Sequence, residues 1–300
     1  MPSAPSHLHR IPARAMTFEK WQALGNDYVI LEKRAVPFEL TPERVRRLCA
    51  AHTGIGSDGV LLLSEPAERG YVARLRVFNP DGSEAELSGN GAREAVLYLR
   101  RAGWIDHDAF SIETAAGEIR PQITGPTTCT IDMGSARLRS PDYPSGGDEG
   151  TGTLTAAGRE LAFQHVSVGN PQCAIEVGDG RPPLEELDLS ELGPQIEGNT
   201  EIFPNRTNVS FWRRDGEGEI TARIFERGVG ETMASGTGAC GAAVAAVLRG
   251  ARSPVTVHLD GGDLEVEVGE DLGVRLTGRA VPVYRGTVSD ELMEELHATE

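Results

Sequence analysis

An internal repeat constrains the fold of this chain more than any other feature. The segment FNPDGSEAELSGNGA, from Phe78 to Ala92, aligns without gaps on FERGVGETMASGTGA, from Phe225 to Ala239, at an offset of 147 residues. In each copy an apolar run typical of a strand leads into a glycine-bearing loop, and Ser-Gly-x-Gly-Ala then opens an apolar stretch of helical character. A looser pair, Gly25-Asn26-Asp27 and Gly169-Asn170-Pro171, follows the start of each half. We therefore expect one strand-loop-helix unit to be used twice.

The repeat divides the chain into two halves, and 300 residues are enough for each half to bury a core of its own. The connecting stretch is rich in Gly, Pro, Ser and Asp, which is typical of loops between domains. We expect domains at residues 16–140 and 150–285, preceded by a disordered extension at 1–15. Short strands and few helices, expected at 41–52, 92–102, 183–197 and 239–249, indicate an α+β fold. Each half would wrap a β-barrel-like sheet around a central helix.

The composition excludes several classes of function. Forty-five acidic against 29 basic residues give a net charge of −16, which argues against nucleic acid as a partner. No apolar run approaches the roughly 18 residues that span a bilayer, so we expect no membrane partner. The first fifteen residues lack the apolar core of a secretory signal, which favours the cytoplasm. The four cysteines form no CxxC pair, and we expect neither a disulfide scaffold nor a metal site. The two lysines lie far from the glycine-rich motifs, which argues against a Schiff-base cofactor.

The two Ser-Gly-x-Gly motifs are candidate anion-binding sites. Each would place a helix N-terminus, with its unpaired backbone N–H groups, at a glycine that lets a ligand approach closely. Taken singly, Ser88 and Ser235 would be N-cap residues, and Asn26, Asn79 and Asn170 would be turn residues. Because the motifs occupy equivalent positions of a repeat, we expect both helix ends to face one small anion.

Six segments in order resemble the diaminopimelate epimerase family from residue 16 to 285. They are GNDYVI (25–30), GIGSDGVLLL (54–63), FNPDGSEAELSGNGAR (78–93), VGNPQC (168–173), FPNRTNV (203–209) and ERGVGETMASGTGAC (226–240). The resemblance implies two pseudo-symmetric domains with the active site between them. It also implies an enzyme that needs neither cofactor nor metal and that interconverts LL- and meso-diaminopimelate, a precursor of lysine and of the cell wall. The partner would be a small diamino diacid, and a homodimer is left open.

The resemblance also implies roles for individual residues. In the family two thiols exchange the α-proton from opposite faces, and here serines, Ser88 and Ser235, occupy both positions. Glu226 matches the glutamate of the family site, whereas Gln172 stands where a histidine usually follows Gly-Asn-Pro. The substrate would be held by amide side chains, by an arginine fork on the distal carboxylate and by backbone amides at the α-carboxylate: Asn26, Asn79, Asn170, Asn208, Glu226, Arg227, Gly89, Asn90, Gly236 and Thr237.

The two serines leave three interpretations open, because a hydroxyl is a far weaker acid than a thiol. The first is an epimerase in which Ser88, Ser235 and Glu226 are catalytic. The second is a lyase, dehydratase or other isomerase of the same fold that uses these serines. The third is a diamino-acid binder without turnover.

Overall fold

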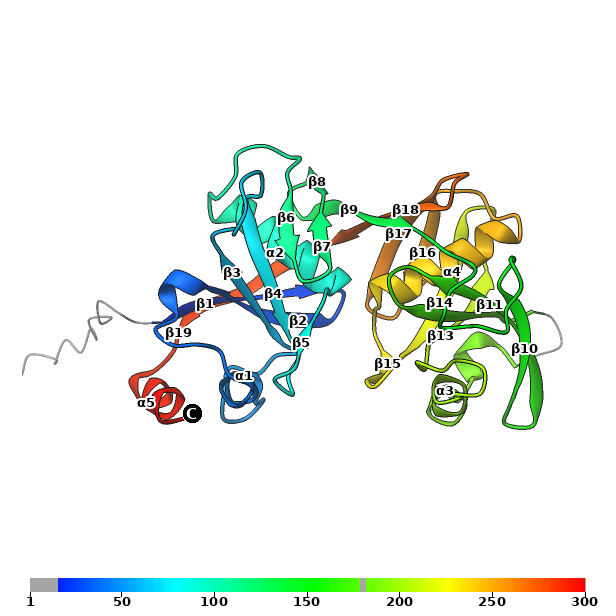
Figure 1. Ribbon diagram of the computed structural model, residues 1–300, viewed down its shortest axis with the longest axis horizontal. Coiled ribbons are helices and arrows are strands. Elements are labelled where there is room, and N and C mark those ends of the chain that lie inside the picture. The colour runs from blue at the N-terminus through cyan, green and yellow to red at the C-terminus, as the bar shows by residue number, and fades with distance from the viewer. Residues whose placement is uncertain (1–15, 179–181, 300) are drawn as a thin grey trace, which may run out of the picture.

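The computed structural model describes residues 16–178 and 182–299. The predicted disordered extension at 1–15 lies outside the described residues. Two β-sheets lie side by side, and each has a central helix against it, α2 (Gly89–Arg101) in one and α4 (Gly236–Leu248) in the other (Figure 1). The expected α+β fold of two sheet-and-helix units is confirmed. Among the described residues no helix is long and apolar enough to cross a membrane.

The first sheet is built around α2 (Gly89–Arg101), and α1 (Pro42–Cys49), α5 (Asp290–Ala298) and the short η1 (Lys33–Ala35) complete this unit. Its described strands are β1 (Thr17–Ala23), β2 (Asn26–Glu32), β3 (Val60–Ser64), β4 (Ala73–Phe78), β5 (Glu84–Ala85), β6 (Ile112–Thr114), β7 (Gly117–Ile119) and β19 (Val281–Thr287). They lie in the order β19-β1-β2-β3-β4-β6-β7, and β5 pairs with β4. One face packs on α2, and the other is covered by α1 and α5 through a second apolar cluster.

The second sheet is built around α4 (Gly236–Leu248), with η2 (Leu184–Glu186) and α3 (Leu189–Glu197) beside it. Its described strands are β8 (Pro121–Gly125), β9 (Thr128–Ser135), β10 (Thr151–Ala156), β11 (Arg159–Ser167), β12 (Pro171–Glu176), β13 (Asn208–Arg214), β14 (Glu219–Glu226), β15 (Gly230–Thr232), β16 (Val255–Leu259), β17 (Gly262–Val268) and β18 (Gly273–Arg279). They lie in the order β10-β11-β12-β13-β14-β16-β17-β18-β9-β8, and β15 pairs with β14.

Glycine allows both central helices to pack closely on their sheets. A Cβ atom added at Gly91 would lie 2.9 Å from Leu61 of β3, and one at the equivalent Gly238 would lie 2.8 Å from Ile224 of β14. Both distances are below normal contact, so a larger residue at either position would push the helix away. The repeated glycines thus fix where each helix begins relative to its sheet.

The two units are related by an approximate two-fold axis. Strands β9 and β18 pair antiparallel with Thr130 opposite Thr277, and these two residues are 147 positions apart. Their hydroxyl groups share a hydrogen bond of 2.7 Å. Gly89 and Gly236 are also equivalent, and a Cβ on Gly89 would lie 3.6 Å from the Gly236 Cα. When equivalent residues face one another the contact is isologous, so the axis passes through both pairs.

Each sheet takes strands from the opposite half of the chain. Strands β8 and β9 pair into the second sheet, and β19, close to the C-terminus, pairs with β1 in the first. Figure 1 shows β9 and β18 running between the two units. The division into domains at 16–140 and 150–285 stays a prediction.

Candidate active site

Ser88 and Ser235 are the N-caps of the two central helices. The Ser88 Oγ accepts a hydrogen bond from the Gly91 amide at 3.1 Å, and the Ser235 Oγ accepts one from the Gly238 amide at 3.2 Å. The N-cap interpretation is therefore confirmed for both residues. Since each serine directly precedes one of the facing glycines, the two caps lie on either side of the approximate two-fold axis.

Ser88 has a second partner that no sequence motif indicated. The hydroxyl group of Tyr28, in β2, donates a hydrogen bond to the Ser88 Oγ at 3.1 Å. Tyr28 is buried, and Gly59 makes room for its ring, because a Cβ there would lie 2.6 Å from the tyrosine Cε1. Burial raises the pKa of Tyr28 above its ordinary value, and the charges of Glu94 and Glu226 raise this pKa further. Glu226 belongs to the second unit, so charges from both units act on Tyr28.

Ser235 has a carboxyl partner. Glu226, the last residue of β14, is hydrogen-bonded to the Ser235 side chain. Burial raises the pKa of Glu226, and the hydrogen bond to Ser235 partly opposes this rise. A carboxyl group with a raised pKa is a stronger base than an exposed one, which suits proton transfer near neutral pH. Each serine thus interacts with one ionisable side chain as well as with a backbone amide of its own helix.

Asn90 links the two units at this point. Its Nδ2 donates to the Asn26 Oδ1 at 3.1 Å and to the backbone oxygen of Ala234 at 3.3 Å. Asn26 in turn donates to Asp58 at 2.9 Å. Arg93, buried one turn into α2, donates to the Asn90 Oδ1 at 2.6 Å. These contacts hold the start of α2 against the residue that precedes Ser235.

On the other side, Asn170 is held next to the start of α4. Its Nδ2 donates to the Thr237 hydroxyl at 3.2 Å, and its Oδ1 accepts from Gln172 at 2.7 Å. Gln172 is fully buried against α4, where a Cβ on Gly241 would lie 2.7 Å from the Gln172 Cβ. The residue at the expected histidine position therefore orients Asn170.

The loop after β14 is fixed through its backbone. The Arg227 amide donates to the Asn208 Oδ1 at 2.8 Å, and the Gly228 amide donates to Glu197 at 3.1 Å. The guanidinium of Arg227 is exposed and donates to the Asn205 carbonyl at 2.7 Å. Asn208 and Glu197 therefore set the direction in which Glu226 and Arg227 leave the strand.

Asn79 differs from the other predicted asparagines, because its described side-chain hydrogen bond stays within its own turn. Its Nδ2 donates to the Ser83 hydroxyl at 2.9 Å, within the turn that follows β4. The structure therefore connects Asn26, Asn90, Asn170 and Asn208 to the serine-capped helices or to the loop of Glu226, and leaves Asn79 at the edge of this group.

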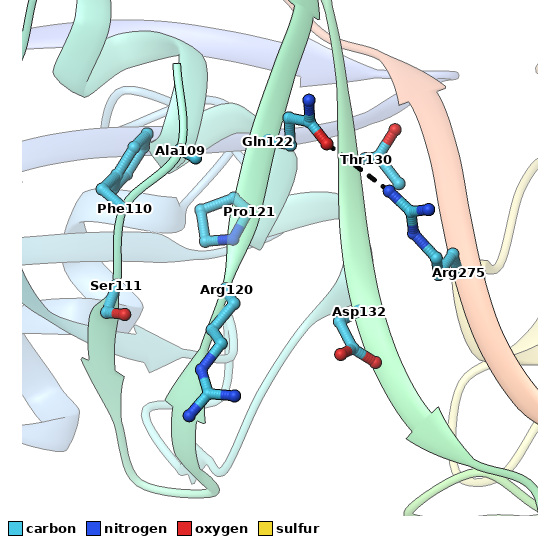
Figure 2. Close-up of a pocket in the computed structure, with 9 residues that line it drawn as sticks. All are labelled: Ala109, Phe110, Ser111, Arg120, Pro121, Gln122, Thr130, Asp132 and Arg275. Carbon is cyan, nitrogen blue, oxygen red and sulfur yellow. Dashed lines mark hydrogen bonds between the residues drawn. The ribbon is translucent and has the colours of Figure 1, made fainter. Parts of the chain in front are cut away.

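A separate surface pocket of about 510 Å³ contains neither serine. It lies between residues 109–111, β8, β9 and β18, and Figure 2 shows its two arginines, Arg120 and Arg275. Arg120 is paired with Glu118, and Arg275 contacts Glu267 and Gln122. Both cations are thus already engaged by protein groups.

The four cysteines are free thiols, and all are buried. Burial raises the pKa of Cys240 to about 12, which agrees with its interpretation as an interior apolar residue. In the described ranges, no three His, Cys, Asp or Glu side chains are grouped so that they could hold a metal ion.

The family model for diaminopimelate epimerase matches residues 18–139 and 164–283. The chain belongs to the diaminopimelate epimerase family. It is 41% identical over 289 residues to the diaminopimelate epimerase of Synechococcus sp. (strain JA-3-3Ab), which covers 93% of this chain and 100% of that protein. It is 40% identical over 289 residues to that of Desulfitobacterium hafniense, with the same two coverages. The predicted isomerase class is confirmed.

Solved structures of more distant proteins share the fold. A probable proline racemase from Agrobacterium radiobacter superposes with a TM-score of 0.67 at 15% identity, covering 92% of this chain and 93% of that one. A methylitaconate-delta-isomerase superposes with a TM-score of 0.65 at 12% identity, covering 91% and 95%. At these identities the likeness concerns the fold alone.

Proposed function

We propose that this family member interconverts LL- and meso-diaminopimelate by removing the α-proton on one face and delivering a proton on the other, without a cofactor. The observation that carries the proposal is the facing pair of serine-capped helix ends, each serine joined to an ionisable side chain. Family membership supplies the substrate class. Ser88, Ser235 and Glu226 would be the catalytic residues.

Proton removal on the Ser235 face needs the neighbouring carboxylate. As the Cα–H bond breaks, its proton passes to the Ser235 oxygen while the serine hydroxyl proton passes to Glu226, and the electron pair stays on the substrate. A serine acting alone would have to form an alkoxide, which is disfavoured at neutral pH. With Glu226 as the final proton acceptor, the negative charge moves from the Glu226 carboxylate to the substrate carbanion.

The helix ends stabilise the charge that develops on the substrate. Backbone N–H groups at Gly89 and Asn90, and at Gly236 and Thr237, would hold the α-carboxylate, where carbanion charge is delocalised. The amides of Asn26, Asn79, Asn170 and Asn208 and the guanidinium of Arg227 would bind the distal amino acid group. A site that grips both ends of a diamino diacid selects against simple amino acids, because a shorter ligand leaves polar groups unpaired.

Deuterium exchange at Cα tests the proposal directly. The enzyme is incubated with LL-diaminopimelate in heavy water, and we expect deuterium at Cα together with the meso isomer, resolved by chiral chromatography. The Ser88→Ala, Ser235→Ala double variant is the control for background exchange. No deuteration above that background at high enzyme concentration would refute the epimerase. Binding by calorimetry without exchange would then favour the binder, and a keto or imine product would favour a lyase.

A further inference from the structure

Glu94, in the second turn of α2, is a buried carboxyl group that has no role in the proton transfers described above. Its side chain is 0% exposed, and within the described part of the chain neither carboxyl oxygen accepts a hydrogen bond of normal geometry, although the backbone amide of Tyr28 is near enough to lower the pKa of the group. A buried polar group without a partner destabilises a fold and for that reason suggests a functional role. Burial raises the pKa of Glu94 well above its ordinary value and so favours the protonated form of the carboxyl group.

The repeat places Glu94 beside Tyr28. Its equivalent in α4, 147 residues later, is Gly241, whose Cβ position lies 2.7 Å from the Gln172 Cβ. Gln172 follows Gly169-Asn170-Pro171 as Tyr28 follows Gly25-Asn26-Asp27, so Gln172 and Tyr28 are also equivalent. The two-fold relation therefore brings position 94 against Tyr28. The charge of Glu94 accordingly raises the pKa of the Tyr28 phenol.

Few other charges act on Glu94. The cation of the adjacent Arg93 favours its ionised form, and Asp27 and Asp58, at the ends of the neighbouring loops, oppose ionisation. These groups do not outweigh burial. Glu94 is thus a buried carboxyl group with a raised pKa, and it acts on Tyr28, whose hydroxyl group is hydrogen-bonded to Ser88.

The two faces of the site differ in their carboxyl groups. Ser235 has Glu226, but the equivalent of Glu226 in the first half is Asn79, an amide that cannot exchange a proton with Ser88. Without a further group, proton delivery by Ser88 would leave an alkoxide or a tyrosinate. Glu94 is a buried carboxyl group of the first half that acts on Tyr28, the hydrogen-bond partner of Ser88.

We propose that Glu94 stores the proton that Ser88 exchanges with the substrate, and that the Tyr28 hydroxyl carries this proton between them. The proposal rests on the proposed epimerase function. In delivery, Ser88 gives its proton to the carbanion and the new Cα–H bond forms. Tyr28 gives its hydroxyl proton to the Ser88 oxygen, and Glu94 gives its carboxyl proton to the Tyr28 oxygen, directly or through one water molecule. The negative charge ends on the Glu94 carboxylate, and proton removal on this face is the reverse sequence.

The energetic reason lies in the ordinary pKa values of the three groups. A carboxylate is a weaker base than a tyrosinate by about six pKa units and weaker still than an alkoxide, and each unit corresponds to about 1.4 kcal/mol. Burial raises the pKa of both Tyr28 and Glu94, and the carboxyl group is the one with the lower ordinary pKa. Glu94 and Tyr28 are positioning residues for Ser88, since neither is placed against the substrate.

Glu94→Gln and Tyr28→Phe test the relay, with Glu19→Gln as the matched control. Glu19 is also a buried glutamate of the first unit, but it is paired with Arg285 and Trp21. We expect both test variants to lower inversion of LL-diaminopimelate about 100-fold or more, the usual contribution of general acid catalysis. Deuterium should still enter Cα with retained configuration through the Ser235 face. The double variant should be no slower than either single one, because both act in one chain.

The pH profile distinguishes a relay from a structural role. Inversion by the wild-type protein should fall as pH rises through the Glu94 ionisation, and this fall should be absent from the residual activity of Glu94→Gln. A Glu94→Gln variant that inverts within about threefold of wild type, with the wild-type pH profile, overturns the relay. If circular dichroism shows that this variant is unfolded, the same criteria applied to Tyr28→Phe decide. Absence of exchange in the wild-type protein refutes the epimerase itself, and the relay with it.

Discussion

At the scale of single residues, the two serines would limit the rate of the proposed reaction. We expect the double substitution Ser88→Cys, Ser235→Cys to raise α-proton exchange by about 100-fold or more. A thiol has a pKa of about 8.5, several units below a hydroxyl, and the helix N-terminus at each position lowers it further. Deuterium incorporation into LL-diaminopimelate measures the effect.

The control for this prediction is Ser289→Cys. Ser289 caps α5 with the same geometry, accepting from the Leu292 amide, but lies outside the site. Exchange should rise in the double variant and stay unchanged in the control. An equal rate in all three proteins would show that the rest of the site no longer supports thiol chemistry.

Glu94 also has a measurable effect on stability. Because burial raises its pKa well above the ordinary value of 4.5, the folded chain keeps this proton at pH values where the unfolded chain has released it. The unfolded state then binds fewer protons, so the free energy of unfolding falls as pH rises from about 4.5 towards the raised pKa. Glutamine does not ionise. The stability of Glu94→Gln relative to wild type should therefore grow with pH, by up to about 1.4 kcal/mol per unit.

Urea unfolding at pH 5, 6, 7 and 8 checks this. A difference between the two proteins that stays constant over this range would mean that Glu94 is ionised in the fold. That result would also remove the stored proton on which the relay depends.

The residue types alone predicted part of the candidate site, and the reason is physical. Serine before Gly-x-Gly predicts a helix cap because its hydroxyl satisfies an unpaired amide two or three residues on, and both caps are present. Tyr28 and Glu94 were not predicted as partners, since each taken alone is compatible with an ordinary core position. Their meeting depends on packing between α2 and β2, which no local pattern encodes.

At the scale of elements, the sequence predicted the two central helices but placed their starts too late. They were expected from residues 92 and 239 and begin at Gly89 and Gly236. Glycine disfavours helix in isolation, but here the serine caps and close packing on the sheet outweigh that preference. The expected helix at 183–197 is divided, because Asp188 caps a new start for α3. Helix α1 ends at Cys49, before the expected 52.

Gly238→Ala tests how tightly α4 must sit on its sheet. The new Cβ would lie 2.8 Å from Ile224 and 3.1 Å from the Ser235 Oγ, so the helix or these side chains must shift. We expect a net loss of about 1 to 2 kcal/mol, since overpacking costs more than the helix preference of alanine restores. Exchange activity should fall as well, because Ser235 moves with the helix.

Gly147→Ala is the matched control. A Cβ there meets nothing within 4 Å, so stability and exchange should both stay at the wild-type level. Chemical denaturation of the two variants gives the comparison. A Gly238→Ala protein as stable as this control would show that the packing at Ile224 is loose.

At the scale of the whole molecule, the repeat predicted a two-fold arrangement, and the antiparallel pairing of β9 with β18 shows how it is built. The register puts Thr130 opposite its own equivalent, Thr277. The exchange of strands between halves could not be predicted, because an alternating apolar pattern does not state which sheet a strand will join. The return of β19 to the first sheet is such a case.

Strand β19 is expected to be essential to the first unit although it is encoded at the far end of the chain. It pairs with β1 along six positions, from Thr17 with Thr287 to Gln22 with Val281. A chain ending at Ala280 would leave the outer edge of β1 without a partner and would remove Val288 and Leu296 from the apolar cluster on that face of the sheet. A chain ending at Val288 keeps β19 and Val288 and loses α5, which contributes Leu296, Leu292 and Met293 to the same cluster.

Hydrogen exchange measured by mass spectrometry on both truncations separates the two cases. Amides of β1 and β2 should exchange rapidly in the chain ending at Ala280 and remain protected in the chain ending at Val288. Amides of β13 and β14, in the second sheet, should stay protected in both chains. Protected β1 amides in the shorter chain would show that the first unit folds without the strand supplied by the second half. In that event the two halves would be separable domains, and the site between them would depend only on the contact of the two helix ends.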